Sequence, residues 1–269
     1  MEDANCRLRY PVLLVHGVFF RDGMRPAYWG RIPALLEAQG ARVFFGQQQS
    51  AESVEASAAF LAGRIRQILQ ETGCEKLHVI AHSKGGLDMR WAIAHCGIAG
   101  QVASLTTVST PHRGCRYVDA LLNKLPHWLV RLIAAGYNGV MRRLGDPAPD
   151  FLAAVQDLTE AVCLPRDREL GLPEGILCRS LGTRLERGRG GRGIPRLAYP
   201  FVKEYDGPND GLVGVHSMRW GEQFTLVEPT GKRGISHWDA TDLHRESLSG
   251  FEPPSLYLQL LQELKAQGL

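Results

Sequence analysis

Residues 78–86 read His78-Val79-Ile80-Ala81-His82-Ser83-Lys84-Gly85-Gly86, an apolar strand that runs directly into a helix. A serine between a strand and a helix, with small residues two positions before and after it, is typical of a nucleophile elbow. Ala81 and Gly85 are these small residues. The tight turn strains the serine backbone and lifts its hydroxyl above the N-terminus of the following helix. We therefore predict that Ser83 is a catalytic nucleophile rather than an ordinary helix cap.

The chain around this turn alternates between short apolar runs and amphipathic stretches. The predicted strands are Pro11–Val15, Arg42–Phe45, Leu77–Ala81, Val102–Ser109, Ile176–Leu181 and Gln223–Glu228. The predicted helices are Trp29–Gln39, Val54–Leu69, Gly86–His95 and Ser255–Ala266. Because strand and helix alternate, we expect an α/β fold with a mainly parallel central sheet and helices on both faces. A chain of 269 residues can form this as one domain, residues 1–269.

Residues 117–164 have helical periodicity and no strand pattern. Their apolar stripe consists of Trp128, Leu129, Leu132, Ile133 and Val140, interrupted by Gly136 and Gly139. The sequence is compatible with two interpretations. The stripe can belong to an ordinary core-facing helix, or the segment can form a helical lid over a binding site, for which glycine hinges are suited.

Composition excludes several classes of protein. With 44% hydrophobic residues the chain can bury a large core, and no run of about 18 apolar residues predicts a membrane-spanning helix. A net charge of +3 is too small to indicate a nucleic-acid partner. Glu2 and Asp3 precede the first apolar run, so no secretory signal is visible. We expect a cytoplasmic protein; the alternative is a secreted protein whose leader has been removed. The six cysteines form no CxxC pair, which argues against a zinc site and predicts free or buried thiols.

The segment Arg184–Arg196 is rich in arginine and glycine. Gly188, Gly190 and Gly193 match the pattern GxGxxG, but a dinucleotide-binding motif must follow a strand and open a helix. This segment instead lies among arginines and runs into Pro195. Such a segment can bind RNA or another anionic partner. Because no aromatic residues interleave the arginines, we favour a flexible solvated loop.

A serine nucleophile needs a general base, and the base needs an acid that orients it. After an elbow these residues are expected in the order serine, acid, histidine. The histidines that follow Ser83 are His95, His112, His127, His216, His237 and His244. Among them His237 follows the last predicted strand, in a turn that suits the base. The turn-rich loop 206–211 supplies the acid; we prefer Asp210 to Asp206, although turn chemistry alone also favours aspartate there.

Backbone N–H groups are expected to bind the oxyanion that forms during acyl transfer. One donor is the residue after the nucleophile, Lys84, and the other lies in the loop after an early strand. Val18 is our candidate, because Gly17 lets the backbone approach closely. His16 either braces this loop or is an ordinary core histidine.

Together these blocks resemble the bacterial true lipases of the α/β-hydrolase superfamily. The residues that carry the resemblance are Tyr10–Gly17, the elbow, Leu105–Gly114, the Leu158-Thr159 pair, Asn209–Val213, His237-Trp238-Asp239 and the C-terminal stretch Tyr257–Leu264. The resemblance implies an α/β-hydrolase fold and triacylglycerol lipase or carboxylesterase activity. It carries over the nucleophile (Ser83), the acid (Asp210), the base (His237) and the oxyanion donors (Val18 and Lys84). It also implies that residues 117–164 form the lid.

The sequence departs from this family at several points. Lys84 stands in the elbow where glutamine, histidine or methionine is usual, and its charge is expected to influence the pH dependence of the site. Val215-His216 stands where secreted members often have a cysteine, so the family disulfide is not expected. The family's zinc-binding insertion is also missing, because Val43–Glu55 is short and has no histidine or aspartate. Asp239 matches one ligand of the family's structural calcium, but Gly182–Leu197 offers only Glu186 as the second; we therefore expect no metal and no cofactor.

The sequence thus predicts a serine ester hydrolase that acts on small-molecule or lipid esters, with a lid that can contact a lipid interface. Two alternatives are kept. One stays within acyl chemistry: an esterase for short or polymeric esters, a thioesterase or an acyltransferase, because a fold does not fix its substrate. The other is a non-catalytic binding protein with a hydrolase fold, against which the intact set of three catalytic residues argues.

Overall fold

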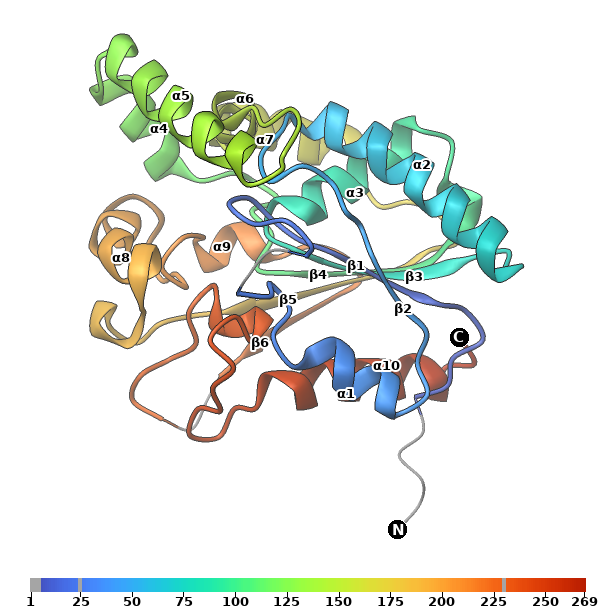
Figure 1. Cartoon of the computed structure of the whole chain (residues 1–269). Helices are drawn as coiled ribbons and strands as arrows, with labels where there is room; N and C mark the ends of the chain where they lie inside the picture. The colour runs from blue at the N-terminus through green and yellow to red at the C-terminus, as the bar shows by residue number, and fades with distance from the viewer. Residues whose placement is uncertain (1–5, 24–25, 229–230) are drawn as a thin grey trace.

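The central element of the computed structural model, which describes residues 6–23, 26–228 and 231–269, is a six-stranded sheet (Figure 1). All neighbouring strands pair in parallel, in the order β2-β1-β3-β4-β5-β6. The strands are β1 (Val12–Val15), β2 (Val43–Phe45), β3 (Leu77–His82), β4 (Val102–Val108), β5 (Leu177–Thr183) and β6 (Gln223–Val227). The predicted parallel α/β sheet is therefore confirmed, with strand ends that differ by one or two residues.

Helices account for most of the remaining described structure. The α-helices are α1 (Ile32–Ala38), α2 (Val54–Thr72), α3 (Lys84–His95), α4 (Arg116–Lys124), α5 (His127–Arg143), α6 (Phe151–Gln156), α7 (Glu160–Leu170), α8 (Gly193–Asp206), α9 (Val215–Met218) and α10 (Pro253–Ala266). The short 3₁₀ turns are η1 (Ala99–Gln101), η2 (Gly188–Gly190) and η3 (Asp239–Thr241). None of the described helices is long and apolar enough to cross a membrane.

Alternate residues of each buried strand pack into different helical layers. Leu13 and Val15 of β1 belong to the core formed with α2 and α3, whereas Val12 and Leu14 belong to the core formed with α1 and α10. Figure 1 shows these two helix pairs on opposite sides of the sheet. Because both faces are covered, binding chemistry is left to the loops at the carboxyl ends of the strands.

The predicted lid segment forms four helices, α4 to α7, and extends beyond residue 164 to the end of α7. Figure 1 shows α4 and α5 projecting from the body above the sheet. The interpretation of α5 as a core-facing helix is wrong, because Trp128 is 67% exposed and Leu132 61% exposed. Only Ala134 and Met141 of α5 are buried.

The prediction of a flexible loop over Arg184–Arg196 is wrong in its second half. The 3₁₀ turn η2 lies within the segment, and α8 begins at Gly193. Gly190 is buried against the chain near the predicted base, and a Cβ on it would lie 2.3 Å from the carbonyl oxygen of Arg233. The backbone at Gly190 is packed, whereas most of the arginine side chains, together with Glu186 and Ile194, are exposed.

Candidate active site

Ser83 occupies a strained turn between β3 and α3. Its φ of 57° and ψ of −133° lie outside the regions that residues other than glycine normally adopt. The turn is held by hydrogen bonds from Ser83 N–H to the Val108 carbonyl (2.9 Å) and from Gly86 N–H to the Ser83 carbonyl (3.1 Å). A Cβ on Gly85 would lie 2.5 Å from the His16 carbonyl oxygen, so this position requires glycine. This geometry is that of a nucleophile elbow.

His237 and Asp210 form a buried pair. His237 Nδ1 lies 2.7 Å from Asp210 Oδ2, and the His237 N–H donates to the Asp210 carbonyl at 2.9 Å. The other carboxylate oxygen, Oδ1, accepts the N–H groups of Leu212 (3.0 Å) and Val213 (2.8 Å). A proton on Nδ1 is thereby directed at Asp210, which leaves Nε2 able to accept another proton.

Ser83 and His237 line the same cavity, but no hydrogen bond joins their side chains within the described residues. Hydrogen bonds between catalytic groups are often long in proteins without substrate and shorten in the complex. The structure therefore brings the three predicted residues to one end of the sheet, with the acid and base already in contact.

The alternative acid, Asp206, has a different structural role. Its carboxylate accepts the N–H groups of Arg116 and Tyr117, both at 3.0 Å, and so caps the start of α4. Burial raises its pKa, an effect opposed by these two hydrogen bonds. Of the two aspartates in this loop, only Asp210 contacts the His237 side chain in the described structure.

The two predicted oxyanion donors flank the serine. Gly17 packs so closely that a Cβ there would lie 2.6 Å from the Cβ of Ser83, which brings the loop carrying Val18 to the nucleophile. In the described part of the chain, the N–H groups of Val18 and Lys84 donate to no protein acceptor. They are therefore available to a ligand oxygen. His16 bonds within this loop, with Nδ1 2.7 Å from the Gly17 carbonyl, as its bracing interpretation predicts.

The side chain of Lys84 points away from the cavity. Its Nζ lies 2.6 Å from Asp88 Oδ1 and 3.1 Å from Ser57 Oγ, in a buried contact between α2 and α3. Burial raises the pKa of Asp88 to about 7, and Lys84 opposes this shift. The expectation that the lysine charge influences the site directly is not supported by this placement, because a buried carboxylate pairs with the ammonium group.

The sequence analysis missed a buried chain of hydrogen bonds through Tyr28 and His82, which we call the Tyr28–His82 relay. The Tyr28 hydroxyl accepts the Gly17 N–H at 3.0 Å and lies 2.6 Å from His82 Nδ1, while His82 Nε2 lies 3.1 Å from the His237 carbonyl. Burial lowers the pKa of His82 well below its usual range, so the ring is neutral. The relay connects the oxyanion loop to the loop of the base. The only sequence signal was a polar residue, His82, in the middle of the elbow.

An apolar cavity of about 270 Å³ opens beside Ser83. Its walls come from the helical segment, from α8 and from the loops after the strands. The residues that line it are Val18, Phe19, Tyr28, Ser83, Pro111, Cys115, Tyr117, Val118, Leu121, Phe151, Val155, Leu158, Ile194, Ala198, Phe201, Leu212, Val213, His237 and Trp238. A cavity with so few polar groups, placed at the serine and histidine, suits an apolar acyl chain.

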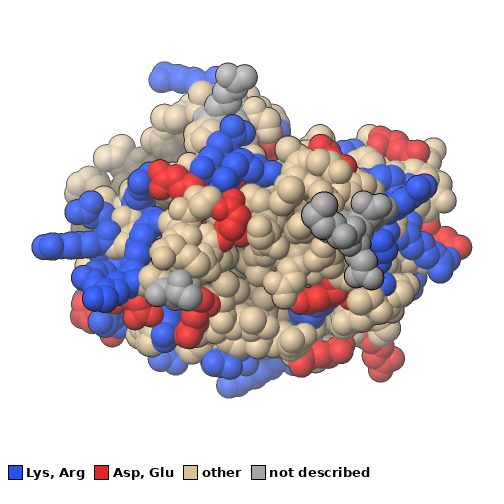
Figure 2. All heavy atoms as spheres, turned by 90° about the horizontal axis from the view of Figure 1, so that it is seen from below, with Lys and Arg blue, Asp and Glu red and all other residues tan. Residues whose placement is uncertain are grey.

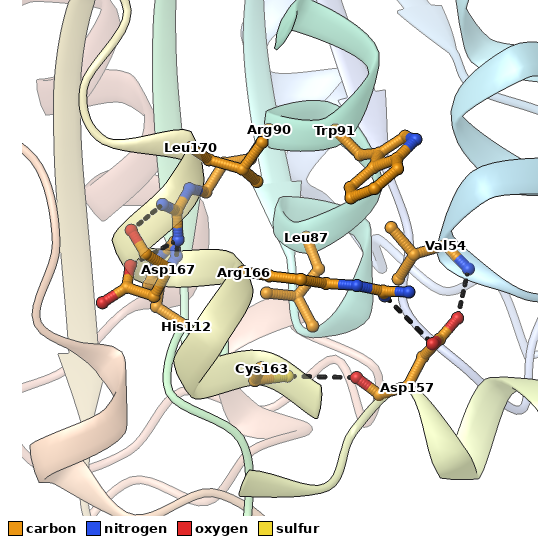
Figure 3. A pocket seen from close by; sticks show the side chains of 10 residues that line it. All are labelled: Val54, Leu87, Arg90, Trp91, His112, Asp157, Cys163, Arg166, Asp167 and Leu170. Carbon is orange, nitrogen blue, oxygen red and sulfur yellow. Dashed lines mark hydrogen bonds and ion pairs between the residues drawn. The ribbon is translucent and has the colours of Figure 1, made fainter. Parts of the chain in front are cut away.

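A second hollow, between α3 and α7, is not a binding site (Figure 3). Its volume of about 10 Å³ holds at most one water molecule. It is crossed by polar contacts: Arg90 Nη1 lies 2.8 Å from Asp167 Oδ1, and Arg166 Nη1 lies 2.9 Å from Asp157 Oδ1. Figure 3 shows Cys163 beside them; burial raises the pKa of its thiol to about 12. The Arg90–Asp167 contact attaches α7 to α3, whereas the Arg166–Asp157 contact joins α7 to the turn after α6. All six cysteines are free, as expected.

The residues at the position of the family's calcium do not fit a metal ion. Asp239 Oδ2 accepts Ser236 N–H (2.9 Å) and Ser236 Oγ–H (2.6 Å), and Arg233 Nη2 lies 3.2 Å from both carboxylate oxygens. Arg233 Nε also donates to the Gly190 carbonyl at 2.5 Å. The described residues contain no group of three or more acidic, histidine or cysteine side chains able to hold a metal. A guanidinium group thus already bridges Asp239 and the turn at Gly190.

Comparison with known proteins identifies the family. Residues 45–145 match the family described as "Putative serine esterase (DUF676)". A triacylglycerol lipase of Pseudarthrobacter phenanthrenivorans is 34% identical over 59% of this chain and 53% of its own length. Triacylglycerol lipase 2 of Saccharomyces cerevisiae is 34% identical over 90% of this chain and 74% of its own. The chain belongs to the triacylglycerol lipase family.

Solved structures agree with this family on the fold. The lipase of Staphylococcus hyicus superposes with a TM-score of 0.73 over 97% of both chains at 17% identity. This chain therefore has the α/β-hydrolase fold. The chain spans about half the length of the bacterial relatives that it matches at 34% identity.

Proposed function

We propose that the protein is a serine hydrolase that cleaves carboxylic esters with lipid-like acyl chains. The observation that carries this proposal is the strained Ser83 beside an apolar cavity that it shares with His237, whose ring contacts the buried carboxylate of Asp210. Membership of the lipase family supports the same reaction class. The intact set of groups argues against the non-catalytic alternative.

The proposed reaction uses groups of this chain alone. Ser83 Oγ attacks the acyl carbonyl and its proton passes to His237 Nε2, while Asp210 stabilises the resulting imidazolium. The N–H groups of Val18 and Lys84 bind the oxyanion of the tetrahedral intermediate. The alcohol leaves with the proton from His237, and the acyl group remains on Ser83. Water then attacks this acyl-enzyme with His237 as base, which releases the acid and restores the serine.

The acyl chain is proposed to occupy the apolar cavity. Side chains of α4 and α6, such as Val118 and Phe151, form part of its wall. A movement of this helical segment would therefore change access to Ser83. We accordingly propose that residues 117–164 act as a lid and that the lid contacts the lipid interface in which such substrates gather.

Initial rates on p-nitrophenyl esters from acetyl to palmitoyl test the proposal, with wild type and Ser83→Ala compared. We expect a loss of about 10⁵–10⁶ in kcat in the variant and a preference of the wild type for medium or long chains. Preference for acetyl esters would support the short-chain esterase alternative. An undiminished rate in Ser83→Ala would overturn the proposal, and turnover of acyl thioesters alone would replace ester hydrolysis by thioester hydrolysis.

A further inference from the structure

Helix α5 exposes large apolar side chains that nothing in the described structure covers. They are Trp128, Leu132, Ile133 and Val140, with Leu144 directly after the helix, and each is between 49% and 67% exposed. Several such side chains together on one helix are unusual on a protein surface, where exposed apolar residues are normally scattered. Since α5 buries only Ala134 and Met141 against its neighbours, this apolar face cannot be explained by the core.

The charges on α5 are all of one sign. Arg131, Arg142 and Arg143 are exposed, and residues 127–143 contain no aspartate or glutamate. Within the described part of the chain none of these three arginines makes an ion pair or a side-chain hydrogen bond. Some exposed arginines elsewhere do, such as Arg116 with Glu160 and Arg192 with Glu246. Others, such as Arg187 and Arg189, also make none in the described structure, so the feature specific to α5 is the combination of unpaired arginines with an exposed apolar stripe. On the face formed by α1 and α10, basic and acidic side chains are interspersed (Figure 2).

The helical repeat places the arginines beside the apolar residues. At about 100° per residue, Arg131 and Arg142 fall within about 20° of each other, along one edge of the stripe that contains Trp128 and Leu132. Arg143 falls within about 20° of Leu132, on the stripe itself, as the last residue of the helix. Arginine at the edge of a stripe with tryptophan and leucine is the pattern of helices that lie in the plane of a membrane surface. The long arginine side chains can then reach lipid phosphates while the apolar residues enter the boundary region.

We propose that α5 binds an anionic lipid surface, with Trp128 and Leu132 inserted and the three arginines in contact with lipid phosphates. This inference rests on the proposed lipid-ester function and adds to it the charge of the lipid surface, which is negative. The surface adjoins the catalytic cavity: Leu121 of α4 lines the cavity, is itself exposed, and lies six residues before the start of α5. Binding through α5 would therefore hold the helices at the cavity wall against the lipid.

Vesicle co-sedimentation tests the proposal. The probes are vesicles of phosphatidylcholine alone and of phosphatidylcholine with phosphatidylglycerol. The test variant is Arg131→Gln/Arg142→Gln/Arg143→Gln. A matched control, Arg9→Gln/Lys76→Gln/Arg168→Gln, removes the same net charge at positions outside α5. We expect wild type and the control to bind anionic vesicles, and the α5 variant to bind them about a hundredfold more weakly at low salt. The variant Trp128→Ala/Leu132→Ala should also lose binding.

Two further measurements separate this proposal from the proposed reaction. Ser83→Ala should bind anionic vesicles like wild type, and the triple arginine variant should hydrolyse a soluble short-chain ester at the wild-type rate. Equal binding to both kinds of vesicle, or equal losses in the two triple variants, would overturn the proposal. So would concentration-dependent dimerisation that Trp128→Ala/Leu132→Ala abolishes, without vesicle binding, because a second copy would then cover α5. Binding of RNA in preference to anionic vesicles would overturn it as well.

Discussion

Two regions of the molecule differ in how their side chains are paired and buried: the loops at the carboxyl end of the sheet, and helix α5. Around Ser83, the buried groups Asp210, His237, His82 and Tyr28 each have a partner within 3.1 Å. On α5 the apolar side chains face solvent and the arginines have no partner within the described residues. The groups around Ser83 are held in place because catalysis requires exact positions, whereas the exposed face of α5 is free to contact a surface outside the chain.

The sharpest contrast within the site is between its two aspartates. We expect Asp210→Asn to lower kcat about 10⁴-fold, because the histidine loses the carboxylate that orients it and stabilises its charged form. Asp206→Asn should keep nearly all of the activity and lower the free energy of unfolding by about 1 kcal/mol, because it weakens the cap of α4. Steady-state rates on a soluble ester and urea unfolding check both. Equal losses of kcat would contradict the assignment.

The buried Lys84–Asp88 pair should dominate stability near the site. Removal of one partner leaves a buried charge uncompensated, so Asp88→Ala is expected to cost about 3–5 kcal/mol of unfolding free energy. The double variant Lys84→Met/Asp88→Leu should recover most of this, because an apolar pair of similar size needs no partner. Since the oxyanion donor is the backbone N–H of residue 84, the double variant should keep its activity. Activity lost without a change in stability would place the lysine charge in the reaction.

The same pair predicts a pH dependence of stability. Burial raises the pKa of Asp88 from 3.8 to about 7, so between these values the folded state binds more protons than the unfolded state. The contribution of Asp88 to stability is therefore full below about pH 4 and decreases as the pH rises to about 7, by at most about 1.4 kcal/mol per pH unit. Unfolding free energies of wild type and Asp88→Asn across this range check it. A difference between the two proteins that stays constant with pH would contradict the prediction.

Substitution of Arg233, which contacts Asp239, tests whether the loop of His237 is held in place without a metal ion. Arg233→Ala should lower kcat about tenfold, because the loop of His237 loses its bridge to Gly190. Guanidinium chloride at non-denaturing concentration should restore part of the rate. Arg184→Ala, which removes a half-exposed arginine with surface partners, should have little effect. We expect EDTA and Ca²⁺ to leave wild type unchanged; inhibition by EDTA that Ca²⁺ reverses would show that a calcium site exists after all.

The sequence predicted the elements that depend on local patterns, and it missed those that depend on contacts between residues far apart in the chain. The sheet and the elbow depend on local apolar periodicity and on small residues at fixed spacing, so residues 78–86 were sufficient to predict β3, α3 and the turn. The Tyr28–His82 relay joins residues 54 positions apart and has no local pattern. Helix α8 was missed because Gly193 and Pro200 oppose helix formation locally, and packing of Tyr199 and Val202 overrides them.

The apolar stripe of α5 shows the limit of periodicity most clearly, since the pattern identifies an amphipathic helix but not what its apolar face meets. The smallest predicted effect follows from this. Leu132→Ser should change the unfolding free energy by less than about 0.5 kcal/mol, because its side chain is already in solvent. Met141→Ser, on the same helix but 4% exposed, should cost about 2 kcal/mol or more. Thermal or urea unfolding distinguishes the two. A large loss in Leu132→Ser would mean that the face is covered within the protein itself, and the contrast between the fixed site and the open helix would then fail.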